Sequence, residues 1–221
     1  MKKTYYFCVL LFLGTSLFAN FSFLDMKDPL LNQKSEKVSI DEINSPEIQE
    51  IIDSMLEIAK GERQDETGSI MVGLAAPQIG ILKRIILVDL KTQEDHKDIS
   101  SDLQVFINPE IICQTKDLRG GREGCYSTGN IHGIVYRASI IKVRAYNRKG
   151  EVIEQTFKDL TARIFQHEID HLEGIRFPDR VFSDQDLHIV EEFEYKEYSE
   201  NYQNWDKIFP IEEWKKIKGS G

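Results

Sequence analysis

The sequence predicts an α+β fold in which antiparallel strands wrap around one central helix. Two stretches, 45–61 and 158–174, have apolar residues at helical spacing, and β-rich runs lie between them. The second helix is apolar on more than one side, so it should be largely buried. The 221 residues are 41% hydrophobic, which is enough for one substantial domain with its own core.

The elements are expected in the following order. Residues 21–44 are polar and mixed, as in an extended arm over the domain. Ser45 can cap the first helix, Pro46 suits its first turn, and Gly61 ends it before a polar loop. After this loop, the β-rich runs at 84–90 and 105–114 predict two strands. Residues 139–157 predict a hairpin with its turn at 147–150, and residues 158–174 predict the central helix.

The two ends of the chain differ in composition from its middle. Lys2 and Lys3 precede an apolar run that ends near Ala19, a pattern typical of a secretory signal. The run is shorter than the about 20 apolar residues of a membrane-spanning helix, so we expect no stable membrane span. The alternative is a cytosolic protein that starts at Met26. Residues 183–203 hold seven acidic residues and one lysine, which predicts a solvated acidic helix or tail.

The net charge of −9 bears on partners. A surface that binds DNA would favour a basic patch, so we expect no DNA partner. Ribosomal RNA also prefers lysine and arginine, and the acidic C-terminal segment therefore argues against docking on the ribosome through that segment.

The central helix carries a motif of metal-dependent hydrolases. His167 and His171 lie one helical turn apart, and Glu168 follows the first histidine. Two imidazoles at this spacing can bind a metal ion, with the glutamate as a general base. The alternative is a pair of core histidines with hydrogen-bond partners of their own. The glutamate in the required place on a buried helix favours the metal.

A catalytic metal usually takes a third protein ligand, which the helix does not supply. Downstream candidates are Glu173, His188 and Glu191, but none lies in a recognisable extension of the motif. Upstream, Cys125 lies in a glycine-rich loop, where a buried apolar role is less natural than for Cys113 in a β-run. In an oxidising compartment the two cysteines could instead form a disulfide, which would prevent Cys125 from binding a metal.

The stretch "MVGLAAPQIG" at 71–80 needs its own explanation. The small residues Gly73, Ala75 and Ala76 let another backbone approach closely. Pro77 stiffens the chain before Gln78, whose amide can donate to an oxygen atom. Alone, such a turn is more often a packing feature than a site.

Together, three stretches resemble the peptide deformylase family, which carries a Gly-hydrophobic-Gly-hydrophobic-Ala-Ala-x-Gln motif, a Glu-Gly-Cys-hydrophobic-Ser motif and a Gln-His-Glu-x-Asp-His-Leu motif in this order. Here they read "MVGLAAPQ", "EGCYS" and "QHEIDHL". The resemblance extends over about 28–181. It implies a peptide-deformylase-like fold. Together with the composition of the two ends, it divides the chain into a signal-like leader at 1–20, a catalytic domain at 21–182 and the acidic C-terminal helix or tail at 183–221.

The resemblance implies a metal-dependent hydrolase that removes the formyl group from N-formylmethionine in new bacterial polypeptides. Cys125, His167 and His171 would then bind one divalent ion, commonly Fe²⁺ in the family, with Zn²⁺, Ni²⁺ or Co²⁺ able to substitute. The donor atoms alone fit zinc and iron equally. Glu168 would act as the acid–base group, and the Gln78 side chain and Tyr126 backbone N–H would stabilise the oxyanion.

The formyl-methionyl peptide or nascent chain would lie as an extended strand against 72–74, with its methionine side chain near Leu160 and Ile164. We expect substrate contacts from Val72, Gly73, Leu74, Glu123, Leu160 and Ile164. Asp170 and Gln166 would orient the metal ligands, and Glu123 and Arg137 would pair to fix the cysteine loop.

The sequence also departs from the family. Met71 replaces the first glycine of the first motif, the loop before it is longer, and Tyr126 is larger than the usual leucine. A leader would direct the protein to export or the membrane, whereas nascent chains are made in the cytosol. Two other functions share some of these residues: an endopeptidase, which would not need Cys125 or Gln78, and a binding protein without activity.

Overall fold

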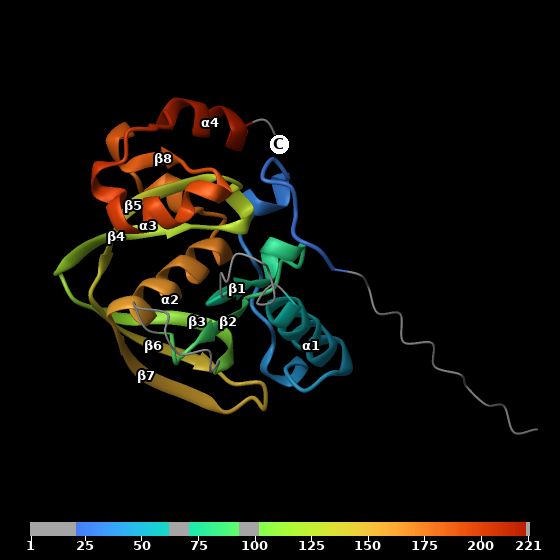
Figure 1. Ribbon diagram of the computed structural model, residues 1–221. Helices are drawn as coiled ribbons and strands as arrows, with labels where there is room; N and C mark the ends of the chain where they lie inside the picture. Colours follow the sequence, from blue (N-terminus) through green and yellow to red (C-terminus); the bar gives the residue numbers. More distant parts are fainter. Residues whose placement is uncertain (1–20, 62–70, 93–101, 220–221) are drawn as a thin grey trace, which may run out of the picture.

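A computed structural model describes residues 21–61, 71–92 and 102–219 (Figure 1). The predicted leader lies outside the described residues, as does nearly all of the polar loop after the first helix. Among the described residues, no helix is both long enough and apolar enough to cross a membrane.

In the described part of the chain, eight strands form two antiparallel sheets. The larger sheet has the order β1-β2-β3-β6-β7, and the smaller has the order β4-β5-β8. The strands of the larger sheet are β1 (Gly73–Ala75), β2 (Ile85–Asp89), β3 (Leu103–Gln114), β6 (Ile140–Tyr146) and β7 (Val152–Lys158). Those of the smaller sheet are β4 (Leu118–Gly124), β5 (Ile131–Ala138) and β8 (Leu187–Ile189).

Helix α2 (Asp159–Leu172) lies between the two sheets and contacts strands of both (Figure 1). The predicted α+β fold with strands around a central helix is therefore confirmed. The predicted first helix is α1 (Pro46–Gly61), which packs on β1 and β2, and two short helices, α3 (Tyr195–Asn201) and α4 (Ile211–Gly219), follow β8. Gly174 ends the turn after α2 with a positive φ of 70°, a conformation that glycine adopts without strain.

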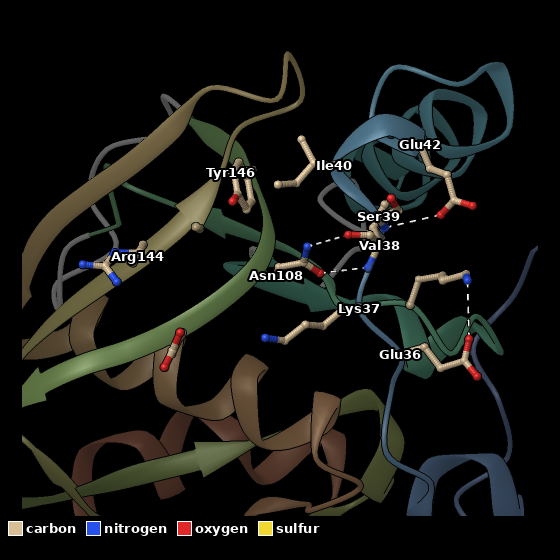
Figure 2. Close-up of a pocket in the computed structure, with 12 residues that line it drawn as sticks. Glu36, Lys37, Val38, Ser39, Ile40, Glu42, Asn108, Arg144 and Tyr146 are labelled. Carbon is tan, nitrogen blue, oxygen red and sulfur yellow. Dashed lines mark hydrogen bonds and ion pairs between the residues drawn. The ribbon is translucent and has the colours of Figure 1, made fainter.

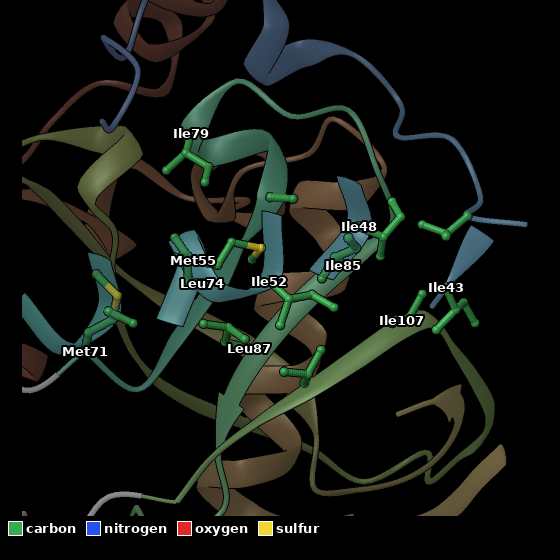
Figure 3. Close-up of a cluster of buried hydrophobic side chains, with 14 residues drawn as sticks. Ile43, Ile48, Ile52, Met55, Met71, Leu74, Ile79, Ile85, Leu87 and Ile107 are labelled. Atoms are coloured by element: carbon green, nitrogen blue, oxygen red, sulfur yellow. The ribbon is translucent and has the colours of Figure 1, made fainter. Parts of the chain in front are cut away.

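Strand β2 lies in the core of the fold and contacts both α1 and α2. All five of its residues are buried, because its two faces pack against different helices. Ile85 and Leu87 join the cluster around α1 (Figure 3), whereas Ile86 and Val88 join the cluster around α2. Since successive side chains of a strand point to opposite faces, an uninterrupted apolar run is what such a two-sided strand requires.

Three expectations need correction. The segment 183–221 is not a solvated tail throughout, because β8 pairs with β5 and the side chains of Tyr198 and Trp214 are buried. Its acidic residues lie mostly on exposed positions, while some of the apolar and aromatic residues, such as Leu187 and Val190, pack inward and others, such as Phe193, are exposed. Residues 21–44 likewise contribute buried side chains, such as Val38. Cys113, expected to be a buried apolar residue, is exposed.

A polar groove lies beside the larger sheet, where residues 36–42 pass strands β3 and β6 (Figure 2). Asn108 closes one end of it with two hydrogen bonds to the backbone of Val38, at 2.9 and 2.7 Å. The groove is lined by Glu36, Lys37, Val38, Ser39, Ile40, Glu42, Lys83, Asn108, Glu110, Arg144, Ala145 and Tyr146. The residues predicted for catalysis lie elsewhere in the described part of the chain.

Candidate metal centre and active site

One cysteine and two histidines converge between the two sheets. The Sγ atom of Cys125 is 3.3 Å from Nε2 of His171, which is 3.3 Å from Nε2 of His167. One ligand atom from each of the three lies within 4.8 Å of the others. Cys125 and Cys113 are both free thiols, so the disulfide alternative is wrong. A thiolate and two imidazoles are donors that suit zinc and ferrous iron, and three donors leave a coordination position open.

Local structure brings the three side chains together. His167 and His171 are one turn apart on α2, so both project from the same face of the helix. Cys125 follows the last residue of β4 and precedes the short 3-10 helix η5 (Tyr126–Thr128). The turn is fixed by the Thr128 hydroxyl, which donates to the Cys125 carbonyl at 2.8 Å, and the Ser127 N–H donates to the sulfur at 3.4 Å.

Glu123 orients the imidazole ring of His167 through a contact with the ring nitrogen Nδ1. Its Oε2 atom is 2.9 Å from Nδ1 of His167, which leaves Nε2 of that ring facing Cys125 and His171. Arg137 donates to both carboxylate oxygens at 3.0 and 2.9 Å, and Arg163 donates to one of them at 2.7 Å. A carboxylate on the second nitrogen is the usual support of a metal-binding histidine.

The charges around Glu123 decide its protonation. Burial alone would raise the pKa of this carboxyl group, but the charge of Arg137 and the hydrogen bonds from His167 and Arg137 hold it far below its usual range. Glu123 is therefore a permanent anion under the histidine. The predicted Glu123–Arg137 pair is confirmed. Glu123 is buried, with 7% of its surface exposed, and in this position it supports His167 rather than lining an open cleft.

The protonation of the two histidines differs in the metal-free site. For His167, burial lowers the pKa, but contacts with Cys125 and Glu123 outweigh burial and raise it well above its usual value. For His171, burial and the positive charge of His167 both lower the pKa far below its usual value. His171 is thus neutral and offers a lone pair to a cation.

Two residues expected to orient the ligands act less directly. Asp170 accepts hydrogen bonds from Arg137 at 2.5 Å and from Arg180 at 2.6 Å, so it reaches His167 only through Arg137 and Glu123. The amide of Gln166 bonds the backbone N–H and carbonyl of Ala138 on β5, at 3.1 and 3.0 Å. Gln166 therefore ties α2 to the smaller sheet, and neither residue contacts a predicted ligand through these bonds.

Glu168 projects from α2 toward β1. It is 5% exposed, and its Oε2 atom has no hydrogen-bond partner within the described structure. Burial raises the pKa of Glu168 to about 7. A methyl group at Gly73 would come 2.4 Å from Oε1 of Glu168, so only glycine lets β1 pass this carboxyl group. An unpartnered buried carboxyl that titrates near neutrality is typical of an acid–base catalyst.

Gln78 lies in the 3-10 helix η4 (Ala76–Ile79), directly after β1. Its Oε1 accepts from the Ala75 N–H at 2.7 Å, which fixes the direction of the amide. Its Nε2 donates to the Cys125 sulfur at 3.3 Å and lies 3.4 Å from the Ser127 hydroxyl. The amide N–H groups of Gln78 thus point toward the Cys125 sulfur and the Ser127 hydroxyl.

The remaining predicted residues surround this centre. Tyr126 is 43% exposed, and its ring stacks on Phe23 with the ring centres 4.7 Å apart. β1, which includes Gly73 and Leu74, is an edge strand of the larger sheet. Val72, Leu160 and Ile164 belong to one apolar cluster beside it, Ile164 buried and the other two half-buried.

The alternative third ligands are occupied elsewhere. Glu173 pairs with Lys34 and Arg84, and His188 contacts the Tyr198 hydroxyl at 3.1 Å. Glu191 accepts a hydrogen bond from Asn130. Cys125 alone among the four candidates lies with the two histidines within the described residues.

Comparisons with known proteins agree with this geometry. The family model described as polypeptide deformylase matches residues 21–186. The chain belongs to the peptide deformylase family. A curated relative, the peptide deformylase of Lachnoclostridium phytofermentans, is 41% identical over 156 residues, covering 71% of this chain and 85% of the relative. The peptide deformylase of Zymomonas mobilis is 35% identical over 161 residues, covering 72% and 84%.

Solved deformylase structures are also similar. A class I type b peptide deformylase from Acinetobacter baumannii with bound Met-Ala-Ser has a TM-score of 0.65 and 33% identity, covering 73% of this chain and 98% of that one. A peptide deformylase from Synechococcus elongatus in complex with actinonin has a TM-score of 0.63 and 32% identity, covering 74% and 82%. The predicted function, metal-dependent hydrolysis that removes the N-terminal formyl group from peptides, is thereby confirmed.

Sequence reasoning missed part of the site. It did not predict the contact between Glu123 and His167, although the signal was present, because residues two apart on a strand face the same side and Glu123 is two residues before Cys125. It also missed Arg163 and Arg176, since a single arginine has no spacing pattern that reveals its partner.

Proposed function

We propose that Cys125, His167 and His171 bind one divalent metal ion and that Glu168 is the acid–base group of deformylation. The observation that supports this most is the meeting of a thiol and two imidazoles within 4.8 Å. When bound, the ion supplies a Lewis acid and lowers the pKa of a coordinated water. We propose Fe²⁺ as the physiological ion, with Zn²⁺, Ni²⁺ or Co²⁺ as substitutes.

Glu168 would take a proton from the attacking water and deliver it to the leaving amine. Burial and the lack of a partner for Oε2 support this role, because the carboxyl group exchanges a proton readily near neutral pH. The formyl carbon becomes tetrahedral and its oxygen becomes negative. The Gln78 amide and the Tyr126 backbone N–H would donate to this oxygen, and losing one such donor typically raises the barrier by about 3–4 kcal/mol.

The substrate would add a strand to the outer edge of β1, the last strand of the described sheet. Val72, Gly73 and Leu74 would pair with the peptide backbone, and Leu160 and Ile164 would line the pocket for the methionine side chain. The position of β1 at the edge of the sheet, beside Glu168, supports this arrangement. Glu123 would contribute to the site through His167.

The test is hydrolysis of formyl-Met-Ala by protein purified anaerobically with iron or nickel. We expect turnover by the parent and loss of both bound metal and turnover in Cys125→Ala. Cys113→Ala is the matched control, because it removes the other described, exposed thiol and should keep metal and activity. Full metal content in Cys125→Ala, or full turnover in Glu168→Ala, would contradict the assigned roles. Metal analysis of protein from the native cell identifies the ion.

We further propose that residues 21–182, with the C-terminal segment that packs on them, form the catalytic domain of a bacterial protein and that 1–20 decides its location. The curated relatives come from bacteria. Cell fractionation of the full chain, and of a chain that starts at Met26, tests the leader. Export of the first and cytosolic retention of the second would support a signal, and cytosolic retention of both would contradict it.

A further inference from the structure

Arg176 is a buried arginine whose hydrogen-bond partners join separate parts of the fold. Its side chain is 1% exposed. Within the described residues, its guanidinium group donates to three neutral oxygens: the Met26 carbonyl at 2.6 Å, the Ser127 carbonyl at 3.3 Å and Oδ1 of Asn32 at 3.0 Å. A buried charge whose hydrogen bonds go to neutral groups is costly, and nearby Asp179 and Cys125 offset part of this cost electrostatically.

The Ser127 contact leads directly to the cysteine. Arg176 fixes the Ser127 carbonyl, while the N–H of the same residue donates to the Cys125 sulfur at 3.4 Å. The Ser127 hydroxyl lies 3.4 Å from Nε2 of Gln78. Ser127, whose carbonyl is held by Arg176, therefore contacts both the Cys125 sulfur and the side-chain amide of Gln78.

The other side of Arg176 is covered by the C-terminal helix. Its guanidinium group lies over the ring of Trp214 on α4, 4.4 Å from the ring centre. Asp179 fixes this arrangement. Its carboxylate accepts from the backbone N–H of Arg176 at 2.9 Å, from Nε1 of Trp214 at 2.8 Å and from the ammonium group of Lys218 at 2.6 Å. A planar guanidinium on an aromatic ring is an attractive contact, strongest where water is excluded.

Apolar packing follows the same path. Trp214 belongs to a buried cluster with Ile131, Phe177 and Leu187, and Cys125 packs against this cluster. The family match ends at residue 186, so Trp214 and α4 lie beyond it. A segment outside the matched region thus covers the back of the cysteine loop.

We propose that Arg176 is a positioning residue for Cys125 and that Trp214 of the C-terminal helix holds it in place. This inference rests on the proposed role of Cys125 as a metal ligand. Without the arginine, the Ser127 carbonyl loses this donor, and the loop that presents the Ser127 N–H to the sulfur is held less firmly. Lysine cannot replace it fully, because one ammonium group cannot match a planar fork of donors and a stacked ring.

Cobalt binding tests this inference independently of catalysis. Co²⁺ is titrated into metal-free protein, and the thiolate-to-cobalt charge-transfer absorption reports both affinity and sulfur ligation. We expect about 10- to 100-fold weaker Co²⁺ binding and an altered band in Arg176→Leu, as for other residues that orient ligands. Arg176→Lys should recover part of the affinity. Trp214→Ala should weaken binding, and Trp214→Phe should weaken it less, because a ring remains.

Trp205→Ala is the matched control. Trp205 is also in the C-terminal segment, but its Nε1 donates to the Ile189 carbonyl, away from Arg176. We expect both alanine variants to lower the melting temperature and only Trp214→Ala to change the cobalt band. If Arg176→Leu does not fold, the comparison of the two tryptophan variants decides.

Parent-like cobalt affinity and absorption in Trp214→Ala, or equal weakening in Trp205→Ala, would overturn the inference. A parent protein that shows the charge-transfer band but does not hydrolyse formyl-Met-Ala would refute the proposed catalytic roles and leave this inference standing. A parent that binds Co²⁺ without the band would refute Cys125 as a ligand, and the inference with it.

Discussion

Replacing Glu123 by glutamine removes one charge from a buried cluster while keeping the shape of the side chain. The two carboxylate oxygens accept four hydrogen bonds, two from Arg137, one from Arg163 and one from Nδ1 of His167. The glutamine amide nitrogen cannot accept, so two of the four donors lose their acceptor and face another donor. Arg137 keeps Asp170 as a partner.

The expected loss follows from these bonds. A hydrogen bond to a charged group contributes about 1.5–3 kcal/mol, so two lost bonds cost about 3–6 kcal/mol. Breaking a buried ion pair independently suggests about 3–5 kcal/mol. We therefore expect Glu123→Gln to lower the unfolding free energy of the metal-free protein by about 4 kcal/mol. For a domain of this size, the melting temperature should fall by about 8–16 °C.

Urea unfolding of metal-free parent and variant at pH 7 measures this difference. Glu154→Gln is the control, because Glu154 also pairs with two cations, Lys142 and Arg144, but on an exposed strand. Such surface pairs contribute about 0–1 kcal/mol. A loss below about 1 kcal/mol in Glu123→Gln, or an equal loss in both variants, would refute the reasoning.

The ion pair between Glu123 and Arg137 also predicts how the unfolding free energy depends on pH. The pKa of Glu123 is lowered by folding, so its contribution to stability is present above the unfolded pKa of about 4.3. As the pH falls below that value, the unfolded parent takes up a proton that the folded parent does not bind. The difference between the parent and Glu123→Gln should therefore narrow with falling pH.

Three further substitutions test the roles of Glu168, Gly73 and His132. Glu168→Ala should retain its metal and lose about 10²- to 10⁴-fold in kcat, measured with formyl-Met-Ala; an unchanged metal content combined with parent-like kcat would contradict it. Gly73→Ala should lower kcat as well, because the added methyl group would displace the carboxyl group of Glu168 that lies 2.4 Å away, and a crystal structure of the variant with Glu168 unmoved would count against this explanation. Burial, with the positive charge of Arg122, lowers the pKa of His132 to about 4, so the folded state binds fewer protons than the unfolded state between about pH 4 and 6.5. Unfolding free energy should fall by about 3 kcal/mol as the pH drops through that window, and His132→Gln should remove this part of the pH dependence; equal slopes for parent and variant would exclude His132 as its source.

The sequence predicted the elements whose pattern is strong. The stripe of α1, the apolar run of β2 and the hairpin β6–β7 are confirmed because their periodicity is set by burial. Strand β4 was missed because Gly120 and Gly121 make it read as a loop. Methyl groups at these two glycines would come 3.1 Å from the Tyr136 ring and 2.8 Å from the Arg163 guanidinium group, so both side chains would have to shift.

The sequence predicted some residues of the site from local spacing and others only in part or not at all. His167 and His171 follow from helical spacing. Cys125 is only one candidate by its glycine-rich loop and becomes the third ligand through the family resemblance, because nothing local shows that β4 ends beside α2. The buried charges around Glu123 and Arg176 depend on contacts between distant segments. C-terminal packing was missed because acidic residues dominate the composition, while the few residues that are buried, such as Tyr198 and Trp214, set the structure.

The brevity of β1 has a consequence for which proteins can be processed. With three residues, this border of the larger sheet can pair with only about as many residues of an incoming chain. In the proposed binding mode, β1 would therefore contact only the first few residues of the substrate, and the sequence that follows would be free to vary. The opposite border, β7, is longer, and Glu154 and Lys158 lie on it, where charged side chains discourage the joining of another strand. One enzyme can thereby serve many different nascent sequences without its sheet becoming a template for aggregation.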